Sequence, residues 1–480
     1  MSNDWMEQAK RQQAVFVAKL KEFLAIDSVE DMSTAGEGKP FGQGVAEALE
    51  YMLALGEQDG FRTRNLEGYA GYIEFGQGEE VAVLVHVDVV PAGEGWTTPP
   101  FSPDIRDGKI FARGAIDDKG PALAAYFAFR MVRDSGLPLS KRVRFIIGTD
   151  EESGWLCMKR YAELEPIPEI GFSPDASFPI IHAEKGQINP LLRLDERAAG
   201  AKCDPAPARW LLRSFQAGER GNMVPDRAEA AIVLAAEAGD DSLVEGLVSD
   251  YQEFLARQGV SGRAERQDGR GLVLRLDGQA AHGMEPCEGR NAGLLLARFL
   301  AGQPFGGDDR RFLELLSAVL YEDYFGAKLG IACEDEATGK LTVNAGILTY
   351  KQDEGASVHL NIRYPATVNA DECVQRLRQA VASLGWKIDR LRTSSGHYVP
   401  KDHPCVLTLQ KVYEEQTGLP ATLLSTGGAT YAKTLKAGVA FGPVFPGKEA
   451  TAHMKDEYAE INDLIAAMAI YAQAIYELAK

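Results

Sequence analysis

The sequence predicts an α/β domain, with a mainly parallel central sheet flanked by helices, and an α+β domain inserted into it. In the N-terminal part, apolar strand-like runs alternate with helical patterns, which is typical of a parallel sheet. Between 187 and 384 the pattern changes to period-two strands that alternate with helices. After 384 the first pattern returns. A chain of 480 residues is long enough for more than one domain, and we expect one from 1–186 and 385–480 and the other from 187–384.

The first segment is expected to begin with an amphipathic helix within residues 1–27, because Phe16, Leu20, Phe23 and Leu24 recur at helical spacing. A second helix, rich in alanine and aromatic residues, is expected over 120–136. Strands are expected over 71–75, 81–90, 141–152 and 169–175. The strand 81–90 is apolar nearly throughout, as in a strand covered on both faces.

The later elements follow from the same patterns. In the inserted domain, period-two strands are expected over 271–278 and 356–365, with a helix over 291–302. After 384 the chain is predicted to rejoin the α/β domain. Its elements there are a strand at 386–392, a helix at 403–418, a glycine-rich turn at 425–433, a strand at 438–443 and a terminal helix from about 457.

Composition limits the classes of partner. The 51 basic and 69 acidic residues give a formal net charge of −18, which argues against nucleic acid and anionic membranes. Six cysteines occur without a C-x-x-C pair, as expected of reduced thiols in the cytosol. The N-terminus is too polar for a signal peptide, and no apolar run is long enough to cross a bilayer. We therefore expect a soluble cytoplasmic protein.

Histidine and acidic residues lie where the predicted strands end, and ligands of open α/β sheets bind at the carboxyl ends of strands. His86 and Asp88 are two residues apart on one predicted strand, so both side chains leave the same face. A lone histidine in an apolar strand is more often a core residue than a ligand. A carboxylate beside it, however, is the usual partner that orients a metal-bound imidazole. The pair therefore favours a metal site, and the core interpretation stays open.

Two pairs of adjacent carboxylates require a positive charge nearby. Asp117 and Asp118 lie in "FARGAIDDKG" (111–120), and Glu151 and Glu152 end a buried strand. Unpaired carboxylates in such a place would cost on the order of several kcal/mol.

Two more candidate ligands come from other parts of the chain. Asp175 ends a third predicted strand, and His453 precedes the last helix, where a plain surface histidine is the simpler interpretation. Together with the residues above, they form a mixed nitrogen and oxygen ligand set with enough negative charge for two divalent cations. One of Asp117 and Asp118 would then bridge the two ions.

The order of these motifs resembles the dinuclear zinc peptidases that include aminoacylases, carboxypeptidase G and carnosinases. The pattern is H-x-D, then G-x-x-D-D-K-G, then E-E, a downstream Asp and a late His. The resemblance covers essentially the whole chain and is strongest to the bacterial PepV-type dipeptidases. Its motifs are "HVDVVPAGEGW", "ARGAIDDKGP", "GTDEESGW", "GNMVPDRA", "AAHGMEP", "NIRYP", "HYVPKDHP" and "STGGATYA".

The resemblance implies a centre with two divalent metal ions per chain, zinc in the first place, with manganese or cobalt as alternatives. His86 and Asp175 would bind one ion, Glu152 and His453 the other, and Asp117 would bridge both. In this family the peptide bond after the bridging aspartate is commonly cis.

The resemblance also implies the catalytic groups. Asp88 would steady His86, and Glu151 would be the general base, which takes a proton from a water between the ions and gives it to the leaving amine. The inserted domain would be a lid, in which His282 resembles the residue that stabilises the tetrahedral oxyanion. A turn histidine that caps the next helix is the alternative.

Substrate contacts are implied in both domains. Asn222 and Arg363 resemble positions that hold substrate, and a guanidinium can bind a free carboxylate through two hydrogen bonds. A structural ion pair is the alternative for Arg363. Ser425, Thr426 and Gly427 would offer backbone N–H groups at a helix start to the same carboxylate.

Other polar residues near these motifs are expected to be structural or receive no role. His359 lies within a period-two strand and is expected to be structural, whereas His397 and His403 receive no role. The charged residues just before the last helix are expected to be surface groups: Lys455, Asp456 and Glu457.

The expected function is a cytoplasmic metal-dependent dipeptidase that hydrolyses unblocked dipeptides, with β-Ala-His and D-residue dipeptides among the candidate substrates. The alternative with the same metal chemistry is a deacylase that removes acetyl or succinyl groups from amino acids. A binding protein without catalysis is disfavoured because every expected ligand and Glu151 are present. The long lid favours a monomer, since PepV-like relatives carry an enlarged lid that imitates a partner.

Overall fold

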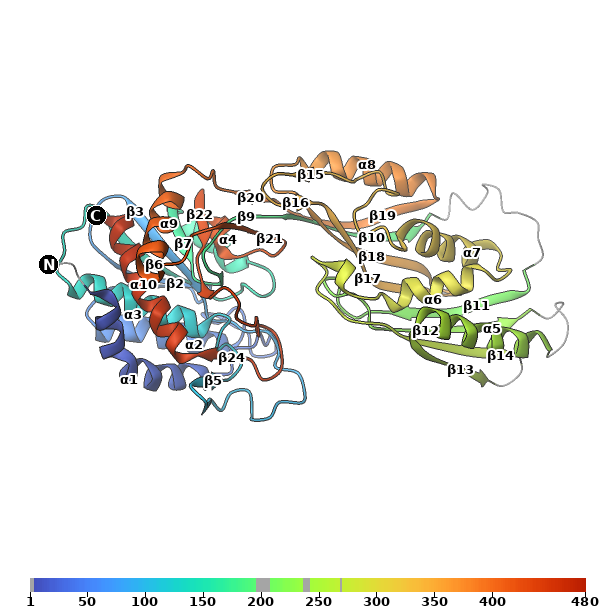
Figure 1. Ribbon diagram of the computed structural model, residues 1–480, viewed down its shortest axis with the longest axis horizontal. Coiled ribbons are helices and arrows are strands. Elements are labelled where there is room, and N and C mark those ends of the chain that lie inside the picture. Colours follow the sequence, from blue (N-terminus) through green and yellow to red (C-terminus); the bar gives the residue numbers. More distant parts are fainter. Residues whose placement is uncertain (1–3, 196–207, 236–241, 268–269) are drawn as a thin grey trace. The chain divides into compact units, whose positions relative to one another are not determined.

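The computed structural model describes residues 4–195, 208–235, 242–267 and 270–480 (Figure 1). It divides into two compact units. Unit 1 contains Met1–Ala183 and Tyr398–Lys480, and unit 2 contains Glu184–His397.

One of the predicted strands belongs to a different unit from the one that the sequence predicts for it. The sequence division assigns 386–392 to the α/β domain, but β19 (Trp386–Ser394) pairs along β10 (Gly186–Leu194) in the sheet of unit 2. The alternating pattern identifies a strand, whereas its partner depends on which backbone edge is free to accept its hydrogen bonds.

Unit 1 is built on a nine-stranded sheet whose four central strands, β6, β3, β7 and β22, are parallel. The strands β1 and β2 extend the sheet in antiparallel fashion on one side, and β9 joins it antiparallel on the other. The predicted mainly parallel centre is confirmed. In sheet order the strands are β1 (Arg62–Leu66), β2 (Ala70–Phe75), β6 (Arg142–Gly148), β3 (Glu80–His86), β7 (Ile170–Ser173), β22 (Ala437–Ala440), β9 (Ile180–Glu184) and β20 (His397–Tyr398), with β21 (Leu423–Thr426) also beside β9.

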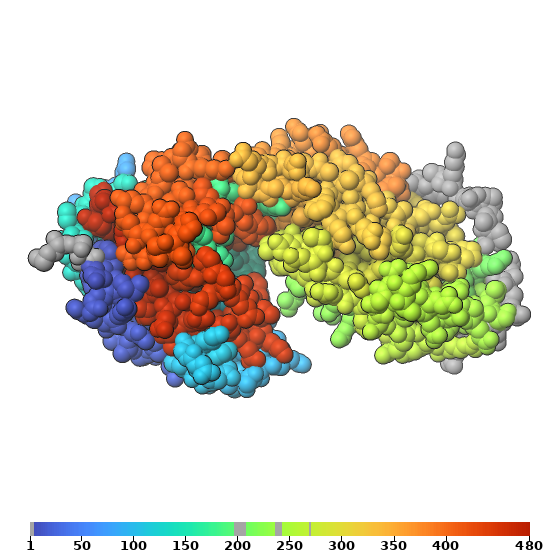
Figure 2. All heavy atoms as spheres, viewed as in Figure 1, coloured from blue at the N-terminus to red at the C-terminus, as the bar shows by residue number. Residues whose placement is uncertain are grey.

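Helices cover both faces of this sheet. They are α1 (Trp5–Leu24), α2 (Gln43–Gln58), α3 (Lys119–Asp134), α4 (Leu156–Leu164), α9 (Pro404–Thr417) and α10 (Ile461–Ala479). Val81, Val83 and Val85 of β3 face a core shared with α1, α3, α9 and α10, whereas Ala82 and Leu84 face a core shared with α4. This burial on both faces explains why the run is apolar nearly throughout. In Figure 1, α1, α3 and α10 lie together, and Figure 2 shows the C-terminal segment beside α1 on the surface of unit 1.

Two boundaries differ from the prediction in ways that affect the site. The strand β3 ends at His86, so Asp88 lies beyond the strand rather than on it. The terminal helix begins at Ile461 rather than near 457, because the preceding residues form β24 and pair with β5. The short strands of unit 1 are β4 (Asp104–Arg106), β5 (Lys109–Phe111), β8 (Ala176–Ser177), β23 (Pro443–Val444) and β24 (Tyr458–Glu460), and η4 (Tyr431–Thr434) is a 3₁₀ turn.

Unit 2 is built on an eight-stranded sheet in which neighbouring strands are antiparallel. In sheet order the strands are β13 (Ser261–Gln267), β14 (Gly271–Asp277), β12 (Arg227–Leu234), β11 (Trp210–Ala217), β17 (Thr342–Lys351), β18 (Gly355–Tyr364), β10 and β19. In β18, Val358, Leu360 and Ile362 enter the core, and His359 and Arg363 alternate with them, as the period of two predicts.

Helices of unit 2 pack on the apolar face of this sheet and close its core. They are α5 (Ser242–Gln258), α6 (Ala292–Ala301), α7 (Gly307–Glu314) and α8 (Ala370–Ser383), with the short helical turns η2 (Pro286–Glu288) and η3 (Leu315–Leu320) and the hairpin of β15 (Glu334–Asp335) and β16 (Gly339–Lys340). Among the described residues of both units, no helix has the length and apolar composition needed to cross a bilayer.

Candidate metal centre

Three parallel strands bring four candidate residues to one edge of the unit 1 sheet. The strands β3, β6 and β7 are neighbours, so their carboxyl ends lie at the same edge. His86 is the last residue of β3 and lies opposite Gly148, the last residue of β6. Glu151 and Glu152 lie in the turn after β6, and Asp175 follows the end of β7.

Two loops bring the remaining candidates to this edge. Asp117 lies just before α3, and its peptide bond to Asp118 is cis. His453 lies in the loop before β24, which Thr451 closes by donating to the carbonyl of Tyr458 at 3.0 Å and accepting from its N–H at 3.3 Å. Because β24 pairs with β5, which precedes the Asp117 loop, these two distant segments of the chain meet.

Asp117 lies at the centre of the group, with one carboxylate oxygen facing each histidine. Its Oδ1 is 3.1 Å from Nε2 of His86, and its Oδ2 is 2.9 Å from Nε2 of His453. The same His453 nitrogen is 3.0 Å from Oε1 of Glu152, and Nε2 of His86 is 3.6 Å from Oδ2 of Asp175. Although burial opposes the effect, the two histidines lower the pKa of Asp117.

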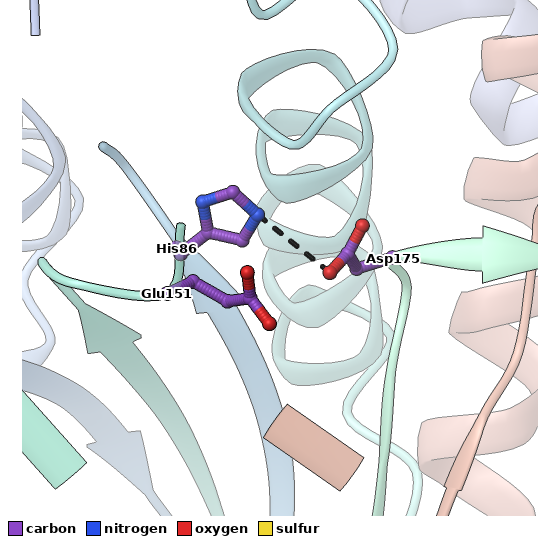
Figure 3. A group of neighbouring side chains, drawn as sticks. All are labelled: His86, Glu151 and Asp175. Carbon is purple, nitrogen blue, oxygen red and sulfur yellow. Dashed lines mark ion pairs between the residues drawn. The ribbon is translucent and has the colours of Figure 1, made fainter. Parts of the chain in front are cut away.

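The donor atoms form two groups of three that could each hold a metal ion. One group is His86, Glu151 and Asp175, and the other is Asp117, Glu152 and His453; within each group the ligand atoms lie within 4.8 Å of one another. Figure 3 shows the first group, with the Glu151 carboxylate directed toward the space beside His86 and Asp175. The resemblance predicts a proton-transfer role for Glu151, and its position beside His86 and Asp175 is also within reach of a metal ion held by them.

Asp88 connects the two groups, although it lies past the end of β3. Nδ1 of His86 is 3.0 Å from the backbone carbonyl of Asp88 and 3.5 Å from Oδ1 of its carboxylate. A carbonyl oxygen only accepts, so Nδ1 carries the proton and donates, which leaves the lone pair of Nε2 free for a metal ion. The other carboxylate oxygen, Oδ2, accepts from the backbone N–H of Glu152 at 3.0 Å.

Asp118 is buried beside the same histidine and faces its backbone. Its Oδ2 accepts from the N–H of His86 at 3.2 Å, and burial raises the pKa of Asp118 well above its usual value. Of the adjacent pair, Asp117 therefore has the geometry expected of a bridging ligand, and Asp118 fixes the loop to the end of β3.

Burial and mutual repulsion raise the proton affinity of the other carboxylates. Burial, followed by the charge of Asp117, raises the pKa of Glu152 to about 7. Burial also raises the pKa of Glu151 well above its usual value; the charge of His86 opposes this shift, and those of Asp175 and Glu152 add to it. Burial lowers the pKa of His453, but Asp117 and Glu152 outweigh it and raise the pKa to about 11. The cluster thus takes up positive charge, which divalent cations would supply.

A second, independent observation also indicates that these residues are suited to bind divalent cations. The buried Nε2 of His86 makes no hydrogen bond with any described residue, because neither of its carboxylate contacts has hydrogen-bond geometry. A buried nitrogen left without a hydrogen bond, aimed at carboxylates, is the arrangement of a metal ligand. Imidazole and carboxylate donors suit zinc, manganese and cobalt.

Two of the predicted lid residues lie together in unit 2. Met223 and His282 form an isolated antiparallel bridge, and the carbonyl of Asn222 accepts from the N–H of Gly283 at 2.6 Å. Nδ1 of His282 accepts from the N–H of Met284 at 3.2 Å, so the proton of a neutral ring lies on Nε2, where it can be donated. Asn222 is exposed. These two residues therefore share one corner of unit 2.

Arg363 lies on β18 of the same unit and is 4% exposed. Its Nε donates to Oδ1 of Asn361 at 3.1 Å, and the amide of Asn361 donates in turn to Asn189 on β10. Burial lowers the pKa of Arg363 to about 10, so the guanidinium is charged at neutral pH.

The glycine-rich segment does not start a helix of useful length. Ser425 and Thr426 end β21, Gly427 follows, and the next element is the four-residue turn η4. The expected helix N-terminus at this segment is therefore wrong, because the turn is too short to align several backbone N–H groups. His403, which received no role, is the N-cap of α9, and its Nδ1 accepts from the N–H of Cys405.

The sequence predicts a surface position for Glu457, and that prediction is wrong. The side chain is 0% exposed and lies under the Asp117 loop, where its carboxylate accepts from the backbone of Ile116 and Asp117. A run of charged residues before a helix gives no local signal of burial, since the cover comes from a distant segment. Lys455 is exposed and Asp456 is half-buried.

Two adjacent groups of carboxylates and imidazoles at the carboxyl edge of a parallel sheet are the arrangement expected of a metal-dependent hydrolase. Residues 82–477 match peptidase family M20/M25/M40. The chain therefore belongs to this family of metallopeptidases, as the motifs predict.

The chain is similar over its whole length to proteins named as dipeptidases. It is 48% identical over 479 residues to "Putative dipeptidase YtjP" of Bacillus subtilis (strain 168), covering 99% of this chain and 100% of that protein. It is 39% identical over 475 residues to "Putative dipeptidase SSP1012" of Staphylococcus saprophyticus subsp. saprophyticus, with 99% of each chain covered.

Solved structures share the fold at low sequence identity. Human carnosine dipeptidase 1 matches with a TM-score of 0.56 and 15% identity, covering 99% of this chain and 98% of that chain. The dipeptidase Dug1p of Saccharomyces cerevisiae matches with a TM-score of 0.56 and 14% identity, also covering 99% of this chain and 98% of that chain. These matches confirm the predicted fold class, an α/β domain with a second domain built on its own sheet.

Proposed function

We propose that the protein is a metal-dependent dipeptidase that hydrolyses unblocked dipeptides. The observation that carries the proposal is the position of Asp117, whose two oxygens face His86 and His453 at 3.1 and 2.9 Å, with further carboxylates beside each histidine. Whole-length relatives at 39% and 48% identity that are named as dipeptidases support the substrate class.

In this proposal two divalent cations, zinc in the first place, bind at the two groups. His86 and Asp175 would hold one ion, Glu152 and His453 would hold the other, and Asp117 would be a ligand shared by both. Asp88 holds His86 in the tautomer that leaves Nε2 free, as its contact with Nδ1 supports. When bound, the cations polarise the scissile carbonyl and acidify water.

Glu151 is the proposed general base. Its carboxylate accepts a proton from the attacking water and delivers it to the leaving amine as the peptide bond breaks. Its half-buried place beside His86 and Asp175 supports this role, because it keeps the carboxylate partly out of bulk water and next to the candidate metal ligands.

Substrate contacts complete the proposal. Arg363 binds the free carboxylate of the dipeptide, His282 donates from Nε2 to the oxyanion, and Asn222 also contacts substrate. The backbone N–H groups of Ser425, Thr426 and Gly427 also donate to this carboxylate, from an irregular turn that has no helix dipole. The protein acts as a monomer in this scheme, and β-Ala-His and D-residue dipeptides remain candidate substrates.

A deacylase with the same ligands is the alternative, and the substrate's amine distinguishes the two. The test measures hydrolysis of a dipeptide panel and of the matched N-acetyl dipeptides and N-acetyl amino acids. Each is assayed with the purified protein, after chelation, and after addition of Zn²⁺ or Mn²⁺.

We expect hydrolysis of the free dipeptides that is lost on chelation and restored by metal, and at least about a tenfold loss when the amine is acetylated. Activity confined to acetylated amino acids would establish the deacylase instead. Hydrolysis of dipeptides that persists unchanged after complete metal removal would reject both.

A further inference from the structure

We propose that Glu457 is a positioning residue, which holds the loop 113–117 in the shape that presents Asp117 to both metal ions. The inference rests on the proposed function, since it takes Asp117 as a ligand of both ions. Glu457 acts through the backbone of that loop and not on the substrate.

Both oxygens of Glu457 are engaged by one short segment. Oε1 accepts from the N–H of Ile116 at 2.9 Å and from the N–H of Asp117 at 3.2 Å. Oε2 forms a buried ion pair with Nη1 of Arg113. Two consecutive N–H groups that point at one oxygen fix the direction of the backbone at the residue that carries the ligand. Glu457 therefore determines where the side chain of Asp117 leaves the backbone.

Arg113 offsets the negative charge of the buried carboxylate. It is 1% exposed, and its Nη2 donates to the carbonyls of Pro91 and Ala92, both at 3.4 Å. A buried carboxylate is tolerated only when paired and hydrogen-bonded, and both conditions hold here. The Glu457 carboxylate therefore has a fixed charged partner beneath the loop.

The loop that carries Glu457 also carries His453. The carbonyl of Glu457 accepts from the N–H of Ala112 at 3.1 Å, which continues the pairing of β24 with β5. His453 lies in the same loop with a φ of 65°. One loop thus provides a candidate ligand and fixes the segment that provides another, and so sets the 2.9 Å contact between Asp117 and His453.

The adjacent Asp456 is a matched control. Its carboxylate accepts from the N–H and the hydroxyl of Thr97 at 2.8 and 2.9 Å, so it fixes a different loop. Its φ is 55°, a left-handed conformation that asparagine tolerates well. The change Asp456→Asn therefore alters a carboxylate in the same loop without touching 113–117.

The change Glu457→Gln tests the proposal because the amide has a single acceptor oxygen. That oxygen can serve the two loop N–H groups or Arg113, but not both. Glu457→Asp is a second variant that keeps the charge and withdraws the carboxylate by one methylene group. Metal-free full-length proteins are titrated with Zn²⁺ alone by calorimetry, and bound zinc is counted after equilibrium dialysis.

We expect the wild type and Asp456→Asn to bind two zinc ions with affinities within about twofold of each other. Both Glu457 variants should lose at least about tenfold in affinity for one ion. Glu457→Gln also leaves the buried Arg113 without its charged partner, so the thermal midpoint of the metal-free variant should fall below that of the control. A purely structural role would lower the midpoint alone and leave the zinc affinity of the folded fraction unchanged.

The outcomes separate the two proposals. A wild type that binds no zinc refutes the metal centre itself. A wild type that binds two ions, with a folded Glu457 variant that binds them equally tightly, refutes only the positioning role. If neither variant folds, Glu457 serves the fold in general, and the positioning role is rejected as well.

Discussion

At the scale of single residues, the centre depends on side chains whose surroundings oppose their ordinary charge. The half-buried Glu152 and Glu151 have raised pKa values because they are partly desolvated among other carboxylates. His453 has a raised pKa because Asp117 and Glu152 outweigh the partial loss of water around its ring. Such a set is costly for the fold unless cations neutralise it, which is the usual sign that the arrangement serves function rather than stability.

The change Glu151→Gln distinguishes a proton-transfer role from ligation. As general base, Glu151 is needed for the chemical step, so kcat should fall by roughly 10²- to 10⁴-fold. The matched change Glu152→Gln should instead lower zinc content, since Glu152 lies 3.0 Å from His453 in the other group. Steady-state kinetics and metal analysis of both variants provide the check. Loss of zinc from Glu151→Gln equal to that from Glu152→Gln would make Glu151 a ligand.

The change Arg363→Ala tests recognition of the substrate's carboxylate. A contact that is equally strong in the ground state and the transition state affects KM, so we expect KM to rise at least about tenfold with a smaller change in kcat. The preference for a free dipeptide over its C-terminal amide should disappear at the same time. The control is Arg390→Ala, whose side chain is 77% exposed on β19. An unchanged preference for the free carboxylate would exclude this role.

At the scale of elements, the sheet of unit 1 is held together by a buried ion network near the start of β3 and β6, away from the edge that carries the metal centre. Arg144 on β6 contacts Glu74 on β2 at 2.8 Å, Glu80 on β3 at 2.9 Å and Glu165 after α4 at 3.1 Å. The guanidinium thus connects three neighbouring strands to the end of a helix.

The change Arg144→Met should lower the free energy of unfolding of unit 1 by about 3 kcal/mol, because it leaves buried carboxylates without their main partner. Arg62 also pairs with Glu74, at 3.2 Å, but its side chain is 63% exposed. The control Arg62→Met should therefore have little effect. Urea denaturation of the metal-free proteins measures both changes. Equal effects of the two substitutions would show that burial does not decide the strength of the network.

At the scale of the whole molecule, the two units have separate cores. The main core of unit 1 joins α1, α3, α9 and α10 to the parallel sheet, whereas the core of unit 2 consists of described residues between Ile188 and Leu391. The candidate metal ligands all belong to unit 1. Metal binding should therefore stabilise one unit directly.

Calorimetry should resolve this division. Zn²⁺ at 100 times its dissociation constant should stabilise unit 1 by about 2.7 kcal/mol for each site that it fills, and should raise only the transition of that unit. The change Leu360→Ala, at a fully buried position of unit 2, should lower the other transition, since such substitutions cost about 2–5 kcal/mol. A single transition that both perturbations move together would show that the units unfold as one.

The sequence by itself determined several of the main elements and the candidate ligands. Apolar runs with acids at their ends predicted the parallel strands, and the ordered motifs selected His86, Asp117, Glu152, Asp175 and His453, which the structure brings together. Local pattern suffices here because strand period and strand ends depend on adjacent residues.

Only the tertiary structure decided which distant segments meet. It paired β19 with β10, placed Asp88 beyond its strand with its carbonyl toward His86, and buried Glu457 beneath the Asp117 loop. Each of these depends on a partner far away in the chain. Whether such segments form a hydrogen bond or an ion pair depends on where the folded backbone places them. The local sequence around a charged residue is the same whether its partner is water or a backbone N–H.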